Sequence, residues 1–446
     1  MSGCHVGSSE DQRNKVALYK ILHGEEQFSL QSWEDLIASG PHGSVVVAFK
    51  ASKSHLVFHL NTDTLVAPVS TPHMPRPGFN LPPEQVQTLI RWINEGVPND
   101  FGAVPFTVHL KGKVLVTNQA EDLVCVIDIA TNLIARYVQA GVPNVFTQPP
   151  HAPHSIAVDR QKQFYYVCLI GAGKVLKYRV SDNALVGEVA GIVSPSEVAL
   201  TSSGDTAFVA QFSPTQSSIR MIDTRTMTLI SPPITHPGLR MAHGMHRSRD
   251  GTMIYVTGYG SDNILVLSLA DLSTSMIPLA DDVPPIPTGA PRFQPYYVEP
   301  SRDDKYIYIS CSKSNEIRVI DRDSMKVVDS IRVGQEPLAV DITPDNSRLY
   351  VANLRSNSVS VIRTSDRSIL TTIENVGVEP HGIKVSGDGN YVYVSCRNTE
   401  ALGDPPHHPT QGSKKPGIVA VIDASTHRVI KRIEVGAFAA GLAIVQ

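Results

Sequence analysis

The chain has 446 residues, with 39 basic and 42 acidic side chains and a formal net charge of −3. A charge this balanced does not favour nucleic acid or an anionic membrane as a partner. No apolar run of about 18 residues is present, so no transmembrane segment is expected, and no signal peptide is visible in the chain as given.

Residues 1–100 are expected to form a small helical domain. The segment SLQSWEDLIASG predicts a short helix that ends at Gly40. The segment LPPEQVQTLIRWINEG predicts a longer helix, with Pro82 and Pro83 at its start and Gly96 at its end. Apolar residues recur along one face of the longer segment, which is typical of a helix packed on a core.

The chain opens on MSGCHVG. Covalent haem attachment has the pattern C-x-x-C-H. Cys4 and His5 fill its last two positions, and Met1 stands where the first cysteine belongs. A CH dipeptide alone says little, and a methionine before proline, such as Met74, is usually a loop or core residue. The order of the segments between them decides how much weight they carry.

That order resembles the planctomycete-type cytochrome c domain: CH, a G-S-x-V turn in PHGSVVVAF, M-P in HMPRPG, then the L-I-x-W-I-x-x-G helix. The resemblance implies that Cys4 forms a thioether to haem c. It implies that His5 is the proximal iron ligand and Met74 the distal ligand, with Trp92 packed near the haem edge. A His/Met pair suits electron transfer, because methionine raises the potential and no site is left open for O₂.

The missing first cysteine leaves two alternatives. In the first, the translation start is assigned too late, and the upstream sequence encodes both the cysteine and an export signal. Otherwise the domain is degenerate or lacks haem, and the chain as written forms one thioether at best. We expect the first, because it explains two absences together and places the protein in the periplasm or outside the cell, where haem c is attached.

A repeat occupies the rest of the chain, from about residue 108 to the end. Six apolar strands such as YIYISC and RLYVAN follow turns rich in Ser, Asp and Gly, and a third and a fourth strand complete each unit. Strand periodicity and an interval of about 42 residues are typical of a β-propeller blade. Seven similar segments begin the units: PHSIAV, PSEVAL, AHGMHR, PYYVEP, PLAVDI, PHGIKV and AAGLAI.

The number of blades follows from how the repeat begins and ends. The first outer set, KVLVTNQAEDLVCVID, has no inner strand before it, and the last inner strand, GLAIVQ, has no outer set after it. We therefore expect residues 440–446 to pair beside Val114–Thr117, closing a seven-bladed ring without free sheet edges. The segments YVTG, YVAN and YVSC resemble the YVTN-repeat propeller family, and we assign residues 101–446 to this domain.

The first residues of the inner strands form a candidate site. Alignment of the seven segments puts three histidines at one position, His154, His243 and His381, with others nearby at His151 and His246. Neutral imidazoles that meet at the channel mouth would suit Cu, Zn or Fe. The alternative is that P-H-G marks a turn whose histidine bonds to a neighbouring blade. The other four aligned residues are Ser196, Tyr296, Leu338 and Ala440.

Two further features have structural explanations. Four cysteines lie in separate expected strands and are interpreted as buried free thiols: Cys125, Cys168, Cys311 and Cys396. The insertion TEALGDPPHHPTQGSKKPG could bring His407 and His408 over a channel mouth, but a polar surface loop explains it as well.

Together these features predict an exported redox protein, with a cytochrome c-like domain before a mainly β, seven-bladed propeller. Its haem would relay electrons to a redox partner protein, or to a small-molecule substrate or metal on the propeller. The alternative is a binding scaffold without enzymatic activity, whose front domain is vestigial. No catalytic triad, phosphate loop or pair of carboxylates in the sequence supports a catalytic assignment.

Overall fold

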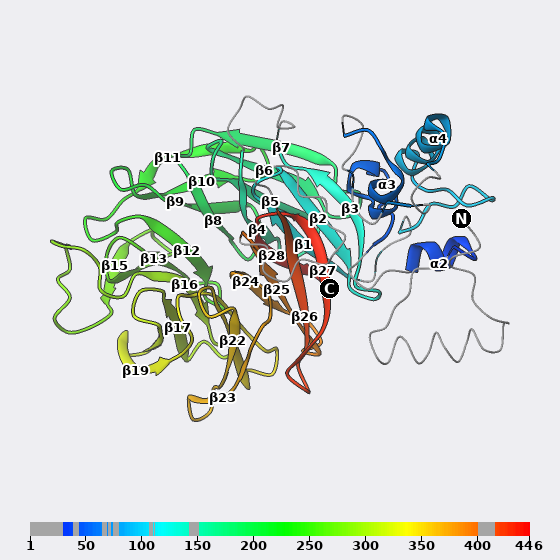
Figure 1. The fold of residues 1–446 in the computed structure, drawn as a ribbon. Coiled ribbons are helices and arrows are strands. Elements are labelled where there is room, and N and C mark those ends of the chain that lie inside the picture. The colour runs from blue at the N-terminus through cyan, green and yellow to red at the C-terminus, as the bar shows by residue number, and fades with distance from the viewer. Residues whose placement is uncertain are drawn as a thin grey trace.

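The structure is a computed structural model, and it describes residues 30–38, 44–64, 69, 73–74, 80–106, 110, 112–141, 151–399 and 415–446. A small helical part lies at one side of a large β-propeller, next to β3 (Leu133–Gln139) and β27 (Arg428–Ala437) (Figure 1). None of the described helices is long and apolar enough to cross a membrane.

The helical part contains both helices expected from the sequence. The longer one starts with proline at its first position, where no backbone N–H is needed, and it buries Val86 and Ile93. Trp33 donates its indole N–H to the carbonyl of Val97 at 2.8 Å, which ties the short first helix to the end of the long one. The helices are α2 (Trp33–Ala38), the 3₁₀ turn η2 (Ala51–Lys53), α3 (His55–Leu60) and α4 (Pro83–Asn94).

The propeller consists of seven four-stranded antiparallel sheets, as the repeat predicts. The inner strands, in blade order one to seven, are β28 (Ala439–Val445), β4 (Pro153–Val158), β8 (Pro195–Leu200), β12 (Ala242–Arg247), β16 (Pro295–Pro300), β20 (Pro337–Ile342) and β24 (Pro380–Val385). The second strands are β1 (Lys113–Asn118), β5 (Phe164–Leu169), β9 (Thr206–Gln211), β13 (Met253–Gly258), β17 (Tyr306–Cys311), β21 (Arg348–Asn353) and β25 (Tyr391–Cys396).

The two outer positions of each blade complete the sheet. The third strands are β2 (Leu123–Asp128), β6 (Lys174–Arg179), β10 (Ser218–Asp223), β14 (Asn263–Ser268), β18 (Glu316–Asp321), β22 (Ser358–Arg363) and β26 (Pro416–Asp423). The outer strands are β3 (Leu133–Gln139), β7 (Leu185–Ala190), β11 (Thr228–Ile234), β15 (Thr274–Pro278), β19 (Lys326–Arg332), β23 (Ser368–Ile373) and β27 (Arg428–Ala437).

The burial of each strand follows from its place in the blade. The second strands are apolar at nearly every position, because both of their faces pack against neighbouring blades; β21, for example, buries five of its six residues. Outer strands such as β19 alternate between partly buried and exposed residues, since one of their faces meets solvent. The core therefore lies between blades rather than in one central layer.

The C-terminal strand closes the ring as predicted. In β28, Ile444 pairs with Val114 and Leu442 pairs with Val116 of β1, antiparallel. β28 and β1 thus share the first blade, although they come from opposite ends of the repeat. The free edges that an open ring would expose are thereby paired.

Every inner strand begins with the same backbone feature. The second residue before each aligned position has a positive φ of 46–58°, and each of these residues is a non-glycine held in the left-handed region. The repeated conformation sets one register for all seven strands. The residues are Ala152, Ser194, Met241, Gln294, Glu336, Glu379 and Phe438.

Two other sequence interpretations can be compared with the structure. All four propeller cysteines are free and buried, as expected, and burial raises the pKa of each thiol. Residues 400–414, with His407 and His408, lie outside the described residues, so the interpretation of the insertion stays a prediction.

Deletion of residues 440–446 should destabilise the protein by several kcal/mol. It removes Leu442 and Ala443 from the core, at about 2 kcal/mol for a large apolar side chain, and leaves the backbone groups of β1 unpaired. Thermal melting measures the loss, and removal of the exposed Gln446 alone is the control. A deletion variant that melts like the intact chain would contradict this closure.

Candidate functional site in the central channel

The three predicted histidines do meet at one mouth of the channel. His154 of β4 lies with its ring centroid 5.4 Å from that of His243 of β12 and 5.5 Å from that of His381 of β24. Tyr296 of β16, from the same register position, packs on His243 with the ring centroids 4.0 Å apart. The structure thus brings together the three histidines that share one register position.

A chain of polar contacts orients the rings. Nδ1 of His243 lies 3.1 Å from the carbonyl oxygen of Tyr296, which leaves its Nε2 without a proton. The hydroxyl of Tyr296 lies 2.8 Å from Nε2 of His381, and the side-chain amide of Gln119 lies 2.6 Å from Nδ1 of His154. The sequence analysis missed Gln119, which comes from the turn after β1 rather than from an inner strand.

The histidine cluster, meaning His154, His243 and His381, is buried and neutral. Burial lowers the pKa of His243 to about 4. Burial, followed by neighbouring cationic groups, holds the pKa values of His154 and His381 well below their usual range. Nδ1 of His381 is buried without a hydrogen-bond partner in the described structure. The cluster therefore presents uncharged imidazole nitrogens, which is the protonation state that metal binding requires.

As the side chains stand, they do not form a metal-ligand set. In the described part of the chain, no group of three or more His, Cys, Asp or Glu side chains is arranged to hold a metal ion. Two of the ring nitrogens are turned toward Gln119 and Tyr296 instead. The alternative of a turn is wrong, because His154, His243 and His381 lie within inner strands. Its second part holds for two of them, since His243 contacts the carbonyl oxygen of Tyr296 in the next blade and His154 contacts Gln119 of the preceding blade.

The glycine after two of these histidines has a packing role. A Cβ on Gly244 would lie 2.4 Å from the carbonyl oxygen of Tyr296, and a Cβ on Gly382 would lie 2.4 Å from that of Ala440. Only glycine lets each inner strand approach the next so closely. In each H-G pair the glycine allows the close packing of two inner strands, and the histidine lies at the channel mouth.

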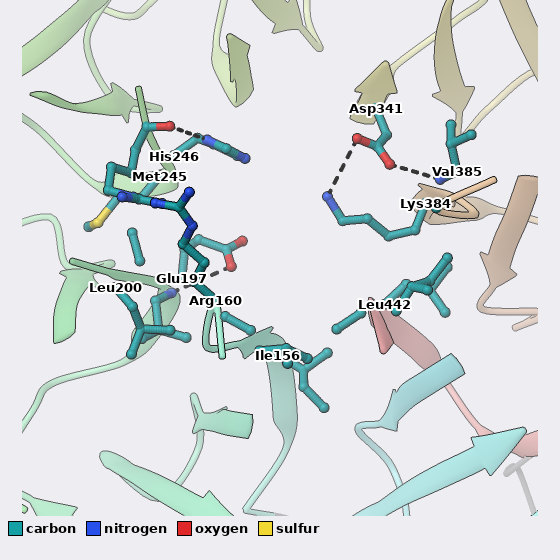
Figure 2. Close-up of a pocket in the computed structure, with 18 of the residues that line it drawn as sticks. Ile156, Arg160, Glu197, Leu200, Met245, His246, Asp341, Lys384, Val385 and Leu442 are labelled. Carbon is teal, nitrogen blue, oxygen red and sulfur yellow. Dashed lines mark hydrogen bonds and ion pairs between the residues drawn. The ribbon is translucent and has the colours of Figure 1, made fainter. Parts of the chain in front are cut away.

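A second, wider cavity lies on the same axis. Its volume is about 610 Å³, and residues of all seven inner strands line it, mostly from their C-terminal halves. A small cavity of about 40 Å³ beside the histidine cluster shares Glu197, Tyr297 and Lys384 with it. Figure 2 shows Glu197 and His246 on one side of the wide cavity, with Asp341 and Lys384 on the other.

The sequence contained a signal for this second mouth that was not used. Three residues after the aligned position of blades four to seven stand His246, Glu299, Asp341 and Lys384, all ionisable. The pairing register shifts within each of these four inner strands, and the structure places His246, Asp341 and Lys384 in the lining of the wide cavity. His246 therefore does not join the histidine cluster, and its Nε2 lies 3.6 Å from Glu299.

A family model described as "Lactonase, 7-bladed beta-propeller" matches residues 106–375, more than half of the chain. The chain belongs to this family. Membership gives the lactonase-type propeller its fold but not its chemistry, because propellers carry many unrelated functions.

Individual proteins are similar to parts of this chain. Antigen Lp49 of Leptospira interrogans is 29% identical over 153 residues, which cover 32% of this chain and 32% of the antigen; the chain thus spans about a third of that relative. A protein of unknown function from Desulfotomaculum acetoxidans has a TM-score of 0.57 at 12% identity, covering 75% of this chain and 99% of that one.

Hydrazine synthase from Kuenenia stuttgartiensis is similar in structure as well. Its TM-score is 0.51 at 16% identity, over 66% of this chain and 95% of that one. At these identities the two solved structures show that the fold is shared and nothing more. The family match covers the propeller strands from β1 to β23, and it includes neither the helices nor the strands β24 to β28.

The haem ligands expected from the cytochrome resemblance are only partly described. Cys4 and His5 lie outside the described residues. Met74 is half-buried, packs against the apolar cluster of the helical part, and donates its backbone N–H to His59 at 2.8 Å. Trp92 lies in the same cluster and donates its indole N–H to Pro98.

Acid should weaken the propeller through the histidine cluster. In the unfolded chain a histidine has a pKa near 6.5, whereas burial lowers the pKa of His243 to about 4 in the folded protein. Stability should therefore be unaffected above pH 6.5 and fall as the pH drops below it. His243 alone should cost about 2 kcal/mol between pH 7 and pH 5.

Urea unfolding at pH 7 and pH 5 measures this effect. The His243→Asn variant should lose about 2 kcal/mol less over that interval than the wild type. His236→Asn, on the loop between β11 and β12, is the matched control and should follow the wild type. Equal pH dependence in wild type and His243→Asn would show that His243 titrates normally.

Proposed function

We propose that the chain is an exported electron-transfer protein, whose helical domain holds haem c and whose propeller is the platform for a redox partner. Bound haem c would supply one-electron transfer at a potential raised by a methionine ligand. By the cytochrome resemblance, Cys4 would hold the thioether, and His5 and Met74 would be the axial ligands. The observation that carries the proposal is the position of Met74 in an apolar cluster.

The surroundings of Met74 fit a thioether ligand. Val57, Leu60 and Ile93 form the buried centre of this cluster. Around them pack half-buried side chains that include Trp33 and Trp92. An apolar surrounding of this kind excludes water from a haem iron and stabilises its reduced form.

The docking of the helical domain supports a separate redox partner as the electron acceptor. Ser44 exchanges hydrogen bonds with the backbone of Ile134 in β3, and Nε2 of His55 lies 2.8 Å from the carboxylate of Glu434 in β27. These are outer strands, and three inter-strand spacings of about 4.8 Å separate them from the channel, on the order of 14 Å. The helical domain thus contacts the perimeter of the propeller rather than the channel.

Replacement of the methionine tests the haem proposal. The chain expressed in a host that matures haem c should show a low-spin spectrum with a weak far-red Met–Fe band. Met74→Ala should abolish that band and lower the reduction potential. Met276→Ala, a half-buried methionine of β15, should leave both unchanged.

The same experiment separates the main alternative. Wild-type protein without covalently bound haem would favour the non-enzymatic scaffold, in which the propeller docks a protein or glycan and the helical domain is vestigial. A haem-loaded protein whose spectrum ignores Met74→Ala would show that another group ligates the iron.

A transition metal in the channel is a second candidate, carried by the convergence of the histidine cluster. Two imidazoles that share one tetrahedral ion have centroids about 5 Å apart, near the separations of 5.4 and 5.5 Å found here. Small rotations about the side-chain bonds would release His154 from Gln119 and His381 from Tyr296. Cu or Zn is the better metal to measure, because bound haem would also contribute Fe to the metal content.

Elemental analysis tests this second candidate. The full chain, dialysed after exposure to Cu or Zn, should retain about one equivalent of metal. The triple variant with His154, His243 and His381 replaced by Ala should retain none, whereas His236→Ala should retain as much as the wild type. Equal metal content in the triple variant, or none in the wild type, would return the histidines to a structural role.

A further inference from the structure

We propose that the wide cavity at the second mouth of the propeller binds a small organic anion, with carboxylate or phosphate groups on a partly apolar body. This inference does not depend on haem or on a metal in the histidine cluster. It rests on the charges, the walls and the volume of the cavity itself.

Cationic side chains outnumber carboxylates around the cavity. Two carboxyl groups line it, Glu197 and Asp341. Burial raises the pKa of Glu197 to about 8, so this carboxyl group is mostly protonated at neutral pH. Five cationic side chains line the same space: Arg160, Arg247, Arg249, Arg302 and Lys384.

Three of the cations already have carboxylate partners. Arg302 and Lys384 share Asp341, with N···O distances of 3.5 and 4.0 Å. Arg249 is paired with Glu299, which is buried behind the wall. In these pairs the charge of Asp341 and Glu299 is offset by cationic partners.

The positive charges of the other two arginines, Arg160 and Arg247, are not paired with a carboxylate within the described residues. Arg247 donates to the hydroxyl of Ser202. Burial and the neighbouring Arg160 and Arg249 lower the pKa of Arg247, which indicates that the cations crowd together. Figure 2 shows Arg160 extending along the cavity on the side of Met245 and His246. Guanidinium groups arranged in this way suit bidentate binding of carboxylate or phosphate.

The remaining walls favour a ligand with an apolar part. Inner strands contribute Ile156, Val198, Leu200, Met245 and Leu442 to the lining. A volume of about 610 Å³ falls in the range of small-molecule sites, about 300–1,000 Å³. The protonated carboxyl of Glu197, at the junction of the two cavities, is a hydrogen-bond donor at the inner end.

Calorimetric titration of the full chain tests the inference with three probes of similar size. Phenyl phosphate carries a phosphate group on an aromatic ring, and phthalate carries carboxylate groups on one. Benzyl alcohol is their neutral counterpart. At least one anion should bind in a salt-dependent manner, and about tenfold or more tightly than benzyl alcohol. The preferred anion identifies phosphate or carboxylate as the group recognised.

Two variants locate the binding. Arg160→Gln and Arg247→Gln should each weaken the preferred anion about tenfold or more, because each removes a charged hydrogen-bond donor. Arg225→Gln, whose side chain is 84% exposed and does not line the cavity, should bind as the wild type does. Arg160 is exposed, so its replacement should leave the melting temperature unchanged.

Three results would overturn the inference. Failure of both anions to bind the wild type would do so, as would equal affinity for benzyl alcohol. Undiminished binding in folded Arg160→Gln protein, with the same melting temperature as the wild type, would place the anion elsewhere. None of these results bears on haem binding at Met74 or on metal content at the histidine cluster.

Discussion

The close approach of one inner strand to the next is the constraint on which the propeller depends. A hydroxyl from the second strand reaches across to the aligned carbonyl of the following blade: Thr117 to His154 at 2.9 Å and Thr257 to Tyr296 at 3.1 Å. Ser310 does the same to Leu338 at 2.5 Å. These bonds satisfy carbonyls that the inner edge of each sheet would otherwise leave without a partner. They also hold the first residues of the inner strands in one ring.

The two ends of the channel use this ring differently. At one end, aromatic and imidazole rings are packed together, and the imidazoles are buried and uncharged. At the other end, ion pairs around Asp341 and Glu299 leave a positive excess beside apolar walls. Glu197, Tyr297 and Lys384 lie where the two cavities meet.

The features that the strand repeat determines could be predicted from the sequence, whereas residues in turns could not. The closing strand and the shared register of the histidines follow from periodicity, because a strand fixes which side chains share a face. Gln119 and Arg160 could not be placed in this way, since both stand in turns, whose geometry the strand period does not determine. The charged residues three positions after the histidine register were accessible to the same alignment and were overlooked. The position of Met74 among apolar side chains depends on helix packing that no periodicity shows.

The helical domain meets the propeller at the junction of the first and last blades, where the ring is closed by pairing alone. Glu121, between β1 and β2, binds Lys53 of the helical domain and also accepts the backbone N–H of Ala437, just before the closing strand. Val47 packs with side chains of both blades. Release of the closing strand must therefore disturb this contact as well. The helical domain therefore stabilises the closed ring, and it should slow hydrogen exchange in β28 relative to the other inner strands.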